Sequence, residues 1–288
     1  MVGYVALIGS AVVYAVGIVA QSVAARRAVR KATVDPGLLV RLAGDPIYLL
    51  GFGAQVIGFV LAYIARGTLP LYLVQAGASS SVALAVLIGY VFLGWRASRA
   101  EVAVLAVIAA GLVLLSLASV PSVSTGMSVQ SGVVLAAVLA LTAVAAVPAW
   151  RLSNAVLLGV LAGVAFTVLA VASRPLASGP LTDLPRHPLA WLMVASAVVG
   201  QTLLAAALQR GSTASTVASM DATTVVLASI AGLTILGDQV SDGRGWFVAA
   251  GLTLVVAGIV TMASVSRSGA GTATVPEPDL DSAREVAA

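Results

Sequence analysis

The chain has 288 residues, of which 60% are hydrophobic and 9% are charged, and its formal net charge is +4. A soluble domain carries roughly a quarter charged residues, so this composition excludes an ordinary water-soluble domain and indicates a protein embedded in lipid. The chain has no cysteine and one histidine, which excludes a disulfide framework and a cysteine-based metal site.

Continuous apolar blocks follow one another along the chain. Each is close to the length of about 20 residues that a spanning helix needs, whereas the strands of a membrane barrel alternate with period two. The blocks cover approximately residues 3–25, 47–65, 69–93, 101–119, 130–148, 154–173, 189–209, 212–236 and 246–263. We therefore predict an all-α polytopic membrane bundle with about nine transmembrane helices.

The basic residues predict the orientation of these spans. The first block has its positive charges after it and not before it, which favours a retained span over a secretory signal. With the N-terminus outside, eleven basic residues fall on the inner side: Arg26, Arg27, Arg30, Lys31, Arg41, Arg96, Arg99, Arg151, Arg210, Arg267 and Arg284. Four fall on the outer side: Arg66, Arg174, Arg186 and Arg244. The positive-inside rule then predicts a cytoplasmic C-terminus.

The rest of the organisation follows from composition. Residues 1–264 are expected to form one transmembrane domain, and residues 265–288 a disordered cytoplasmic tail, because this segment is polar and has no apolar period. Arginine outnumbers lysine fourteen to one, and alanine, valine and glycine abound. We interpret this as GC-rich coding, which favours a bacterial protein of the plasma (inner) membrane.

Two distant stretches of the chain resemble each other. Arg66–Gly67 opens one and Arg210–Gly211 opens the other, and at an offset of 144 residues Val82 meets Val226. We predict repeat-like units at 1–119 and 130–264, although alanine- and valine-rich helices can also resemble each other by chance. Because the matched stretches are an odd number of spans apart, the units would lie inverted, which is typical of secondary transporters with a mid-membrane site.

The same region resembles a known family. The family motifs are Gly200–Gln201, Ala206–Ala207–Leu208–Gln209–Arg210–Gly211, Leu236–Gly237–Asp238, Gly251 and Gly258. They resemble the C-terminal signature of the drug/metabolite transporter superfamily with its EamA-like repeats. The N-terminal part resembles the nine-span NIPA-like branch, through Ala6–Leu7–Ile8–Gly9–Ser10, Gly17, Gln21 and Pro46–Ile47–Tyr48–Leu49–Leu50–Gly51. The resemblance implies a transporter fold, and the NIPA-like branch is associated with magnesium transport in eukaryotes.

The chain departs from the family pattern in three places. Asp238 stands where the family has glutamate, and Gly94–Trp95 replaces the acidic turn of the first repeat. Neither Ala76 nor Met220 supplies the proline that is common in the superfamily's fourth helix. The resemblance therefore bears on the fold more than on the substrate.

Asp221 is the strongest candidate for a functional residue, because it is the only carboxylate deep within a predicted span. An aspartate at a helix centre costs about 2.5–3.5 kcal/mol on insertion, so it needs a partner or water. Thr224 shares its helix face. Asp221 could couple transport to a proton or a cation, and would be the metal ligand if a cation is carried. The alternative is a neutral carboxyl group hydrogen-bonded within the bundle.

Four neutral polar residues could complete such a site. Gln75 and Ser79 lie on one face of the stretch that aligns with the Asp221 region, and Gln55 and Gln201 occupy comparable places in the preceding spans. They could line a shared cavity as ligands. The alternative is ordinary hydrogen bonding between helices, which contributes about 0.6 kcal/mol per contact in membranes.

Other motifs predict structural roles. Gly159 and Gly163 allow close helix contact, within the protein or in a homodimer. Asp238 is expected to lie in a helix-ending turn near Arg244, without a role in transport. No phosphate loop, catalytic constellation or basic nucleic-acid patch is present in the sequence, so we expect no enzyme activity, no cofactor and no nucleic-acid partner.

The sequence thus predicts a secondary transporter of a small solute in the lipid bilayer, gradient-driven or facilitative, that works by alternating access. The first alternative is a magnesium or divalent-cation transporter, although one buried acid is few for an ion that prefers several oxygen ligands. The second is a non-transporting scaffold or accessory subunit of an envelope complex.

Overall fold

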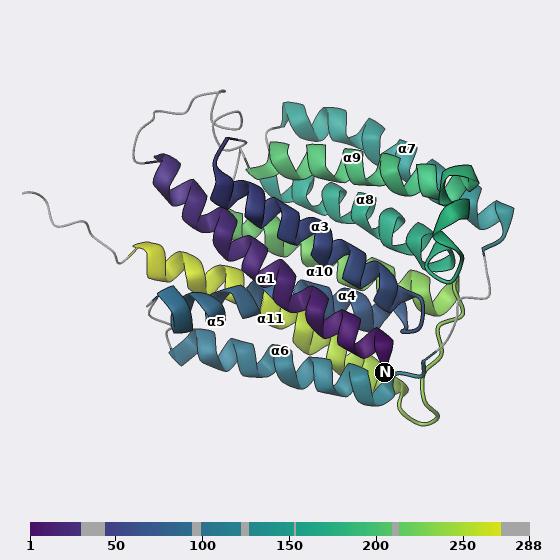
Figure 1. The fold of residues 1–288 in the computed structure, drawn as a ribbon, viewed down its shortest axis with the longest axis horizontal. Helices are drawn as coiled ribbons and strands as arrows, with labels where there is room; N and C mark the ends of the chain where they lie inside the picture. Colours follow the sequence, from purple (N-terminus) through teal and green to yellow (C-terminus); the bar gives the residue numbers. More distant parts are fainter. Residues whose placement is uncertain (30–43, 94–98, 122–126, 153, 209–212, 272–288) are drawn as a thin grey trace, which may run out of the picture.

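The computed structural model describes residues 1–29, 44–93, 99–121, 127–152, 154–208 and 213–271 (Figure 1). Within these ranges the chain is almost entirely α-helical, and the β-bridge that occurs there joins Ser119 to Val240. The first helices are α1 (Val2–Val29), α3 (Pro46–Arg66), α4 (Leu71–Ser79), α5 (Ser81–Leu93) and α6 (Arg99–Ala118). The others are α7 (Val129–Arg151), α8 (Ala155–Leu176), the 3-10 helix η1 (Leu181–Arg186), α9 (Pro188–Leu208), α10 (Thr213–Thr234) and α11 (Gly245–Gly271).

Every predicted apolar block is helical, so the prediction of a membrane-embedded helical bundle is confirmed. In the described residues, seven stretches are long and apolar enough to cross a membrane. Two shorter apolar helices, Val102–Ala118 and Gly245–Thr261, accompany them. The total of nine spans stays a prediction.

Local chemistry explains where two of the helices begin. Asp45 precedes α3, and its Oδ1 accepts hydrogen bonds from the backbone N–H of Ile47 at 2.7 Å and of Tyr48 at 3.3 Å. Asn154 precedes α8 and accepts from the N–H of Leu157 at 3.0 Å. Such side chains satisfy the amides that a helix leaves free at its first turn.

One predicted span has a one-residue interruption, and one predicted boundary is wrong. Helix α4 ends at Ser79 and α5 begins at Ser81, yet Leu71–Gly89 forms one stretch that is long and apolar enough to cross a membrane, in agreement with the predicted block 69–93. At the interruption, Ser80 Oγ donates to the carbonyl oxygen of Gly77 at 2.6 Å, and such a bond to the preceding turn competes with the regular helix. At the other end of the chain, α11 continues to Gly271, so residues 265–271 are helical and not part of a tail. The remainder of the predicted tail lies outside the described residues.

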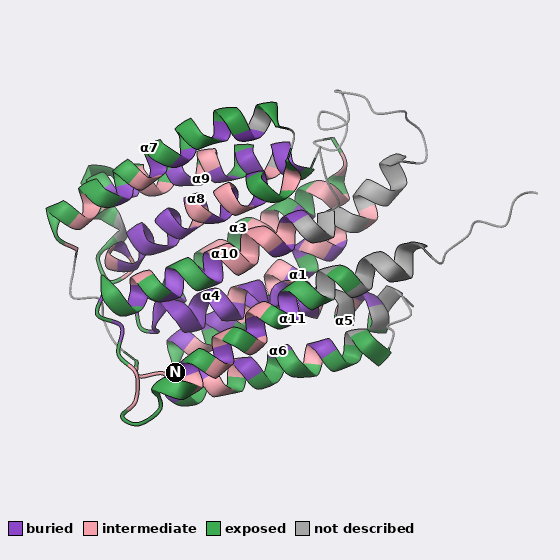
Figure 2. Cartoon of the chain, turned by 180° about the vertical axis from the view of Figure 1, so that it is seen from behind, coloured by how far each residue is buried: buried purple, intermediate pink, exposed green. Residues whose placement is uncertain are grey.

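The helices run roughly along one direction, so their ends gather at two opposite ends of the bundle (Figure 1). In the first half of the chain α1 packs against α3 and α5, and in the second half α8 packs against α9 and α10. The two halves meet where α6 packs on α11 and α4 packs on α10. Buried residues concentrate on α4 and α8, whereas α7 and α9 show much exposed surface (Figure 2).

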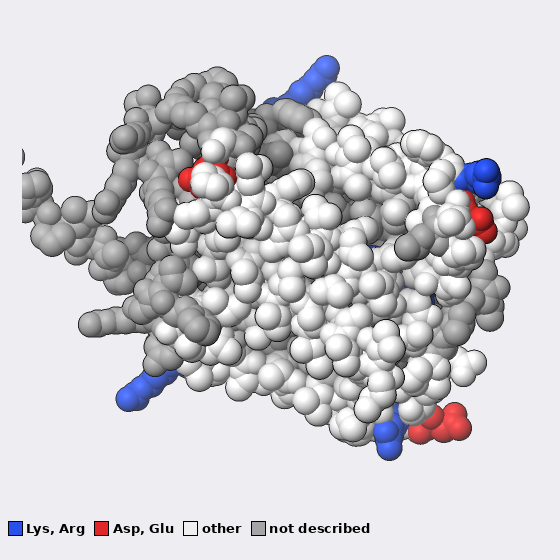
Figure 3. All heavy atoms as spheres, in the orientation of Figure 1, with Lys and Arg blue, Asp and Glu red and all other residues white. Residues whose placement is uncertain are grey.

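The surface agrees with a lipid environment. The face between the two ends of the bundle is free of described charged side chains over most of its area, and these side chains gather at the ends (Figure 3). Many large apolar side chains are exposed, among them Leu50, Leu141 and Val144. Exposed apolar surface of this extent is costly in water and is expected of residues that face lipid.

Glycines set the closest helix contacts. A Cβ atom placed on Gly58 of α3 would lie 2.9 Å from Cγ of Tyr14 of α1, and one on Gly200 of α9 would lie 2.9 Å from Cε1 of Phe166 of α8. Where α6 meets α11, a Cβ atom on Gly111 would lie 2.9 Å from the carbonyl oxygen of Gly251. Any side chain at these positions would force the helices or rings apart.

Candidate functional site

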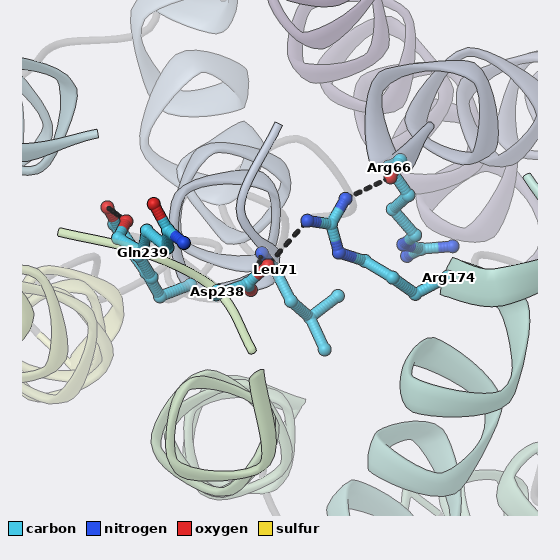
Figure 4. Close-up of polar contacts among 6 residues, drawn as sticks. Arg66, Leu71, Arg174, Asp238 and Gln239 are labelled. Carbon is cyan, nitrogen blue, oxygen red and sulfur yellow. Dashed lines mark hydrogen bonds and ion pairs between the residues drawn. The ribbon is translucent and has the colours of Figure 1, made fainter. Parts of the chain in front are cut away.

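Three charged residues are buried together at one end of the bundle. Arg66 closes α3, Arg174 lies in the last turn of α8, and Asp238 lies in the loop after α10 (Figure 4). Their exposed fractions are 4%, 0% and 6% respectively. Charged groups buried this deeply are retained only where other groups compensate for the water they lose.

Asp238 is compensated on both carboxylate oxygens. Its Oδ1 forms an ion pair with Nη2 of Arg174, and its Oδ2 accepts a hydrogen bond of 2.5 Å from the backbone N–H of Leu71. Leu71 is the first residue of α4, and the N-terminus of a helix favours a negative charge. Nη1 of Arg174 donates to the carbonyl oxygen of Arg66. One ion pair therefore ties together the end of α3, the start of α4, the end of α8 and the loop after α10.

The structure corrects two sequence-based interpretations at this place. Arg66 and Arg174 were expected to be positive charges of outer loops, but both are buried in the last turns of helices. Asp238 does lie in a turn after a helix, as predicted, but its ionic partner is Arg174 and not Arg244. Arg244 is exposed and donates to the carbonyl oxygen of Leu117 at 2.6 Å. The sequence did contain a signal for the burial of these two arginines. Each directly follows an apolar block, so its side chain can reach back into the bundle.

The Arg66 side chain points to neutral partners. Its Nη1 donates to Ser173 Oγ at 3.3 Å and its Nη2 donates to Gln75 Oε1 at 3.0 Å. The guanidinium carbon lies 5.6 Å from the centre of the Phe59 ring. In the part of the chain that the structure describes, Arg66 Nε has no hydrogen-bond partner and no carboxylate forms an ion pair with Arg66.

Asp221 lies in the middle of α10, inside the bundle, and keeps part of its surface accessible. Among the described residues no hydrogen-bond or ion-pair partner holds its carboxylate. Tyr14 of α1 is within electrostatic range of both Asp221 and Arg66. Tyr14 was not predicted as a site residue, because an aromatic side chain in an apolar block gives no sequence signal of its own.

The neutral candidates divide into two groups. Gln75 and Ser79 are buried on α4, and Gln75 is bonded to Arg66. Gln55 is half-buried on α3 where this helix packs on α1, whereas Gln201 is exposed on α9. The structure thus brings Gln75 to the charged cluster and leaves Gln201 on the outside.

Thr224 serves a contact between helices. Its Oγ1 lies 2.8 Å from the carbonyl oxygen of Met220 and 3.2 Å from that of Gly163 on α8, and it donates toward both. A Cβ atom on Gly163 would lie 2.6 Å from the same Met220 oxygen, and one on Gly159 would lie 2.5 Å from Ser219 Oγ. The Gly159 and Gly163 pair therefore makes its close contact within the protein, between α8 and α10.

The described residues contain no group of three or more histidine, cysteine, aspartate or glutamate side chains that could hold a metal ion. The arrangement instead offers one compensated ion pair, one arginine with neutral ligands and one aspartate without a partner. Comparison with family models, curated proteins and solved structures gave no match for this chain.

Proposed function

We propose that the chain is a secondary transporter that carries a small solute across a membrane by alternating access. The observation that carries the proposal is the set of polar and charged side chains inside an apolar bundle, where the two halves of the chain meet: Tyr14, Arg66, Gln75 and Asp221. Ionisable residues are costly inside a membrane and commonly mark the path of a substrate or ion.

Helix packing supports the proposed inverted repeat. The pairs α1–α3 and α8–α9 pack alike, with Gly58 against Tyr14 in one and Gly200 against Phe166 in the other. The two glycines are 200 − 58 = 142 residues apart, close to the offset found in the sequence. In the proposed repeat, α6 is equivalent to α11 and α4 is equivalent to α10. Each of these pairs packs together, as is expected where a two-fold axis relates the two halves. We therefore retain the nine-span, drug/metabolite transporter-like architecture as part of the proposal.

The local charge favours an organic solute over a magnesium ion. Hard divalent cations prefer several oxygen ligands, and no described group of acids could supply them. Arg66 and Asp221 are both within electrostatic range of Tyr14, and the positive charge of Arg66 would repel a cation. Magnesium is therefore the less favoured substrate. The alternative of a non-transporting scaffold would hold if no solute is transported across the membrane.

The proposed orientation places the N-terminus outside and the C-terminus in the cytoplasm. Thr182 of η1 and Leu152 after α7 are exposed at opposite ends of the bundle, and the native chain has no cysteine. In intact cells, a membrane-impermeant thiol reagent is expected to label Thr182→Cys and to leave Leu152→Cys unlabelled until the membrane is broken. The reverse pattern would invert the proposed orientation.

The transport proposal is tested with purified protein in liposomes and a single buried cysteine. Counterflow is measured for carboxylates, phosphates, amino acids, nucleosides, cationic drugs and divalent cations. Ser79→Cys, at the end of α4 and one helical turn beyond Gln75, is expected to react slowly with a small thiol reagent, at a rate that changes severalfold when the transported solute is added. Ser196→Cys is the matched control, because Ser196 is fully buried on α9 away from α4. Absence of counterflow for every solute, with both cysteines unreactive, would refute the proposal.

A further inference from the structure

Among the described residues, the buried charged cluster has an excess of one positive charge. It contains two guanidinium groups, Arg66 and Arg174, and one carboxylate, Asp238, which Arg174 and the N-terminus of α4 already compensate. Arg66 is buried with no acidic partner in the described ranges. Because removing an ion from water costs several kcal/mol, an uncompensated buried arginine is expected to be paired in some functional state.

The hydrogen bonds of Arg66 leave room for such a partner. A guanidinium group has five N–H donors, of which Ser173 and Gln75 each accept one. The other three, including the one on Nε, have no acceptor among the described residues. Free N–H groups on a planar fork match the two oxygens of a carboxylate or phosphate group.

The neutral surroundings do not remove this need. The C-terminus of α3 and the ring of Phe59 both favour a positive charge at this place, but neither accepts the free N–H groups. Gln75 and Ser173 hold the plane of the guanidinium group from α4 and α8, which belong to different halves of the chain. The anion-binding group would therefore be held by both halves, so that a movement of one half against the other would act on it.

We propose that Arg66 binds the anionic group, a carboxylate or a phosphate, of the solute that the protein transports. This inference rests on the transporter function proposed above. Arg66 is closed off from the surface in this structure, so the anion enters when the halves of the bundle separate. Gln75 positions the guanidinium group through its hydrogen bond to Nη2 of Arg66.

Thermal unfolding of the purified full-length protein tests this site. Inorganic phosphate, succinate and acetate are added at equal ionic strength, with chloride as the reference. At least one of the three anions is expected to raise the Tm of the wild type by several degrees, and to raise the Tm of Arg186→Gln equally. Arg186 is an exposed arginine at the same end of the bundle and serves as the matched control. In Arg66→Gln this rise is expected to disappear.

A second variant keeps the test decisive if Arg66→Gln does not fold. Gln75→Glu places a carboxylate where Gln75 Oε1 now lies, 3.0 Å from Arg66 Nη2. We expect this built-in anion to raise the Tm without any ligand and to abolish the further rise that phosphate or succinate gives. An arginine with a purely structural role predicts that added anions act on Gln75→Glu as on the wild type, and that result would overturn the proposal.

Further measurements separate the possible failures. If a neutral or cationic solute shows counterflow that Arg66→Gln leaves unchanged, the transporter function stands and the anion site is wrong. If anions stabilise the wild type but show no counterflow, the site stands and transport is wrong. A lipid phosphate is distinguished by repeating the Tm measurement in phosphatidylglycerol-containing and purely neutral micelles. A rise that occurs only with phosphatidylglycerol would replace the solute by a lipid headgroup and overturn the proposal.

Discussion

Replacing Asp238 by asparagine is expected to destabilise the protein by about 3–5 kcal/mol, the usual cost of removing one partner of a buried ion pair. The amide would remove the carboxylate that forms an ion pair with buried Arg174, and would meet the N–H of Leu71 with a weaker acceptor or with an NH₂ group that cannot accept. For a chain of this length we expect a fall in Tm on the order of 10 °C. The fall is measured by thermal unfolding in detergent.

Asp242→Asn is the control for this experiment, because Asp242 lies in the same loop and is exposed. Removing both charges, with Arg174→Gln and Asp238→Asn together, should cost less than the sum of the two single changes, since neither group is then left without its partner. Equal Tm values for Asp238→Asn and Asp242→Asn would show that the ion pair contributes nothing to stability.

Much of the fold could be predicted because the helices are bounded by local signals. Asp45 and Pro46 open α3, and the block predicted at 47–65 is observed at Pro46–Arg66. The insertion cost of a residue depends mainly on its own side chain, so a run of apolar residues shows where a span lies. The interruption at Ser80 was missed because hydropathy does not record a serine that bonds back to its own helix.

The site could be predicted only in part, because its contacts join residues far apart in the chain. Arg174 and Asp238 are 64 positions apart, and each by itself looks like a charge at the end of a span. Hydropathy assigns such a residue to a loop, since it measures the cost of burying the charge and not the partner that offsets it. Gln75 could be selected as a polar residue within a span, but its bond to Arg66 follows from the packing of α3 and α4.

Replacing Asp221 by asparagine is expected to have the opposite effect to the change at Asp238. Asp221 has no partner among the described residues that would be left unsatisfied, and an amide has nearly the same shape as a carboxyl group. The fold and the Tm should therefore stay close to those of the wild type. Transport driven by an ion gradient should be lost, because an amide can neither take up a proton nor carry the charge that attracts a cation.

The measurement compares two kinds of transport in the same liposomes. If one proton moves with each solute, a gradient of one pH unit supports about a tenfold accumulation, since 1.4 kcal/mol corresponds to a factor of ten. We expect this accumulation, or the equivalent one driven by a sodium gradient, in the wild type and in the control Asp183→Asn, whose carboxyl group is exposed in η1. Asp221→Asn should show no accumulation while it still exchanges solute down a gradient. If it accumulates solute as the wild type does, Asp221 is not the coupling group. The expected loss of accumulation would distinguish the two aspartates of the bundle by their partners: Asp238 holds helix ends together through Arg174 and Leu71, whereas Asp221, without a partner among the described residues, is free to change its charge.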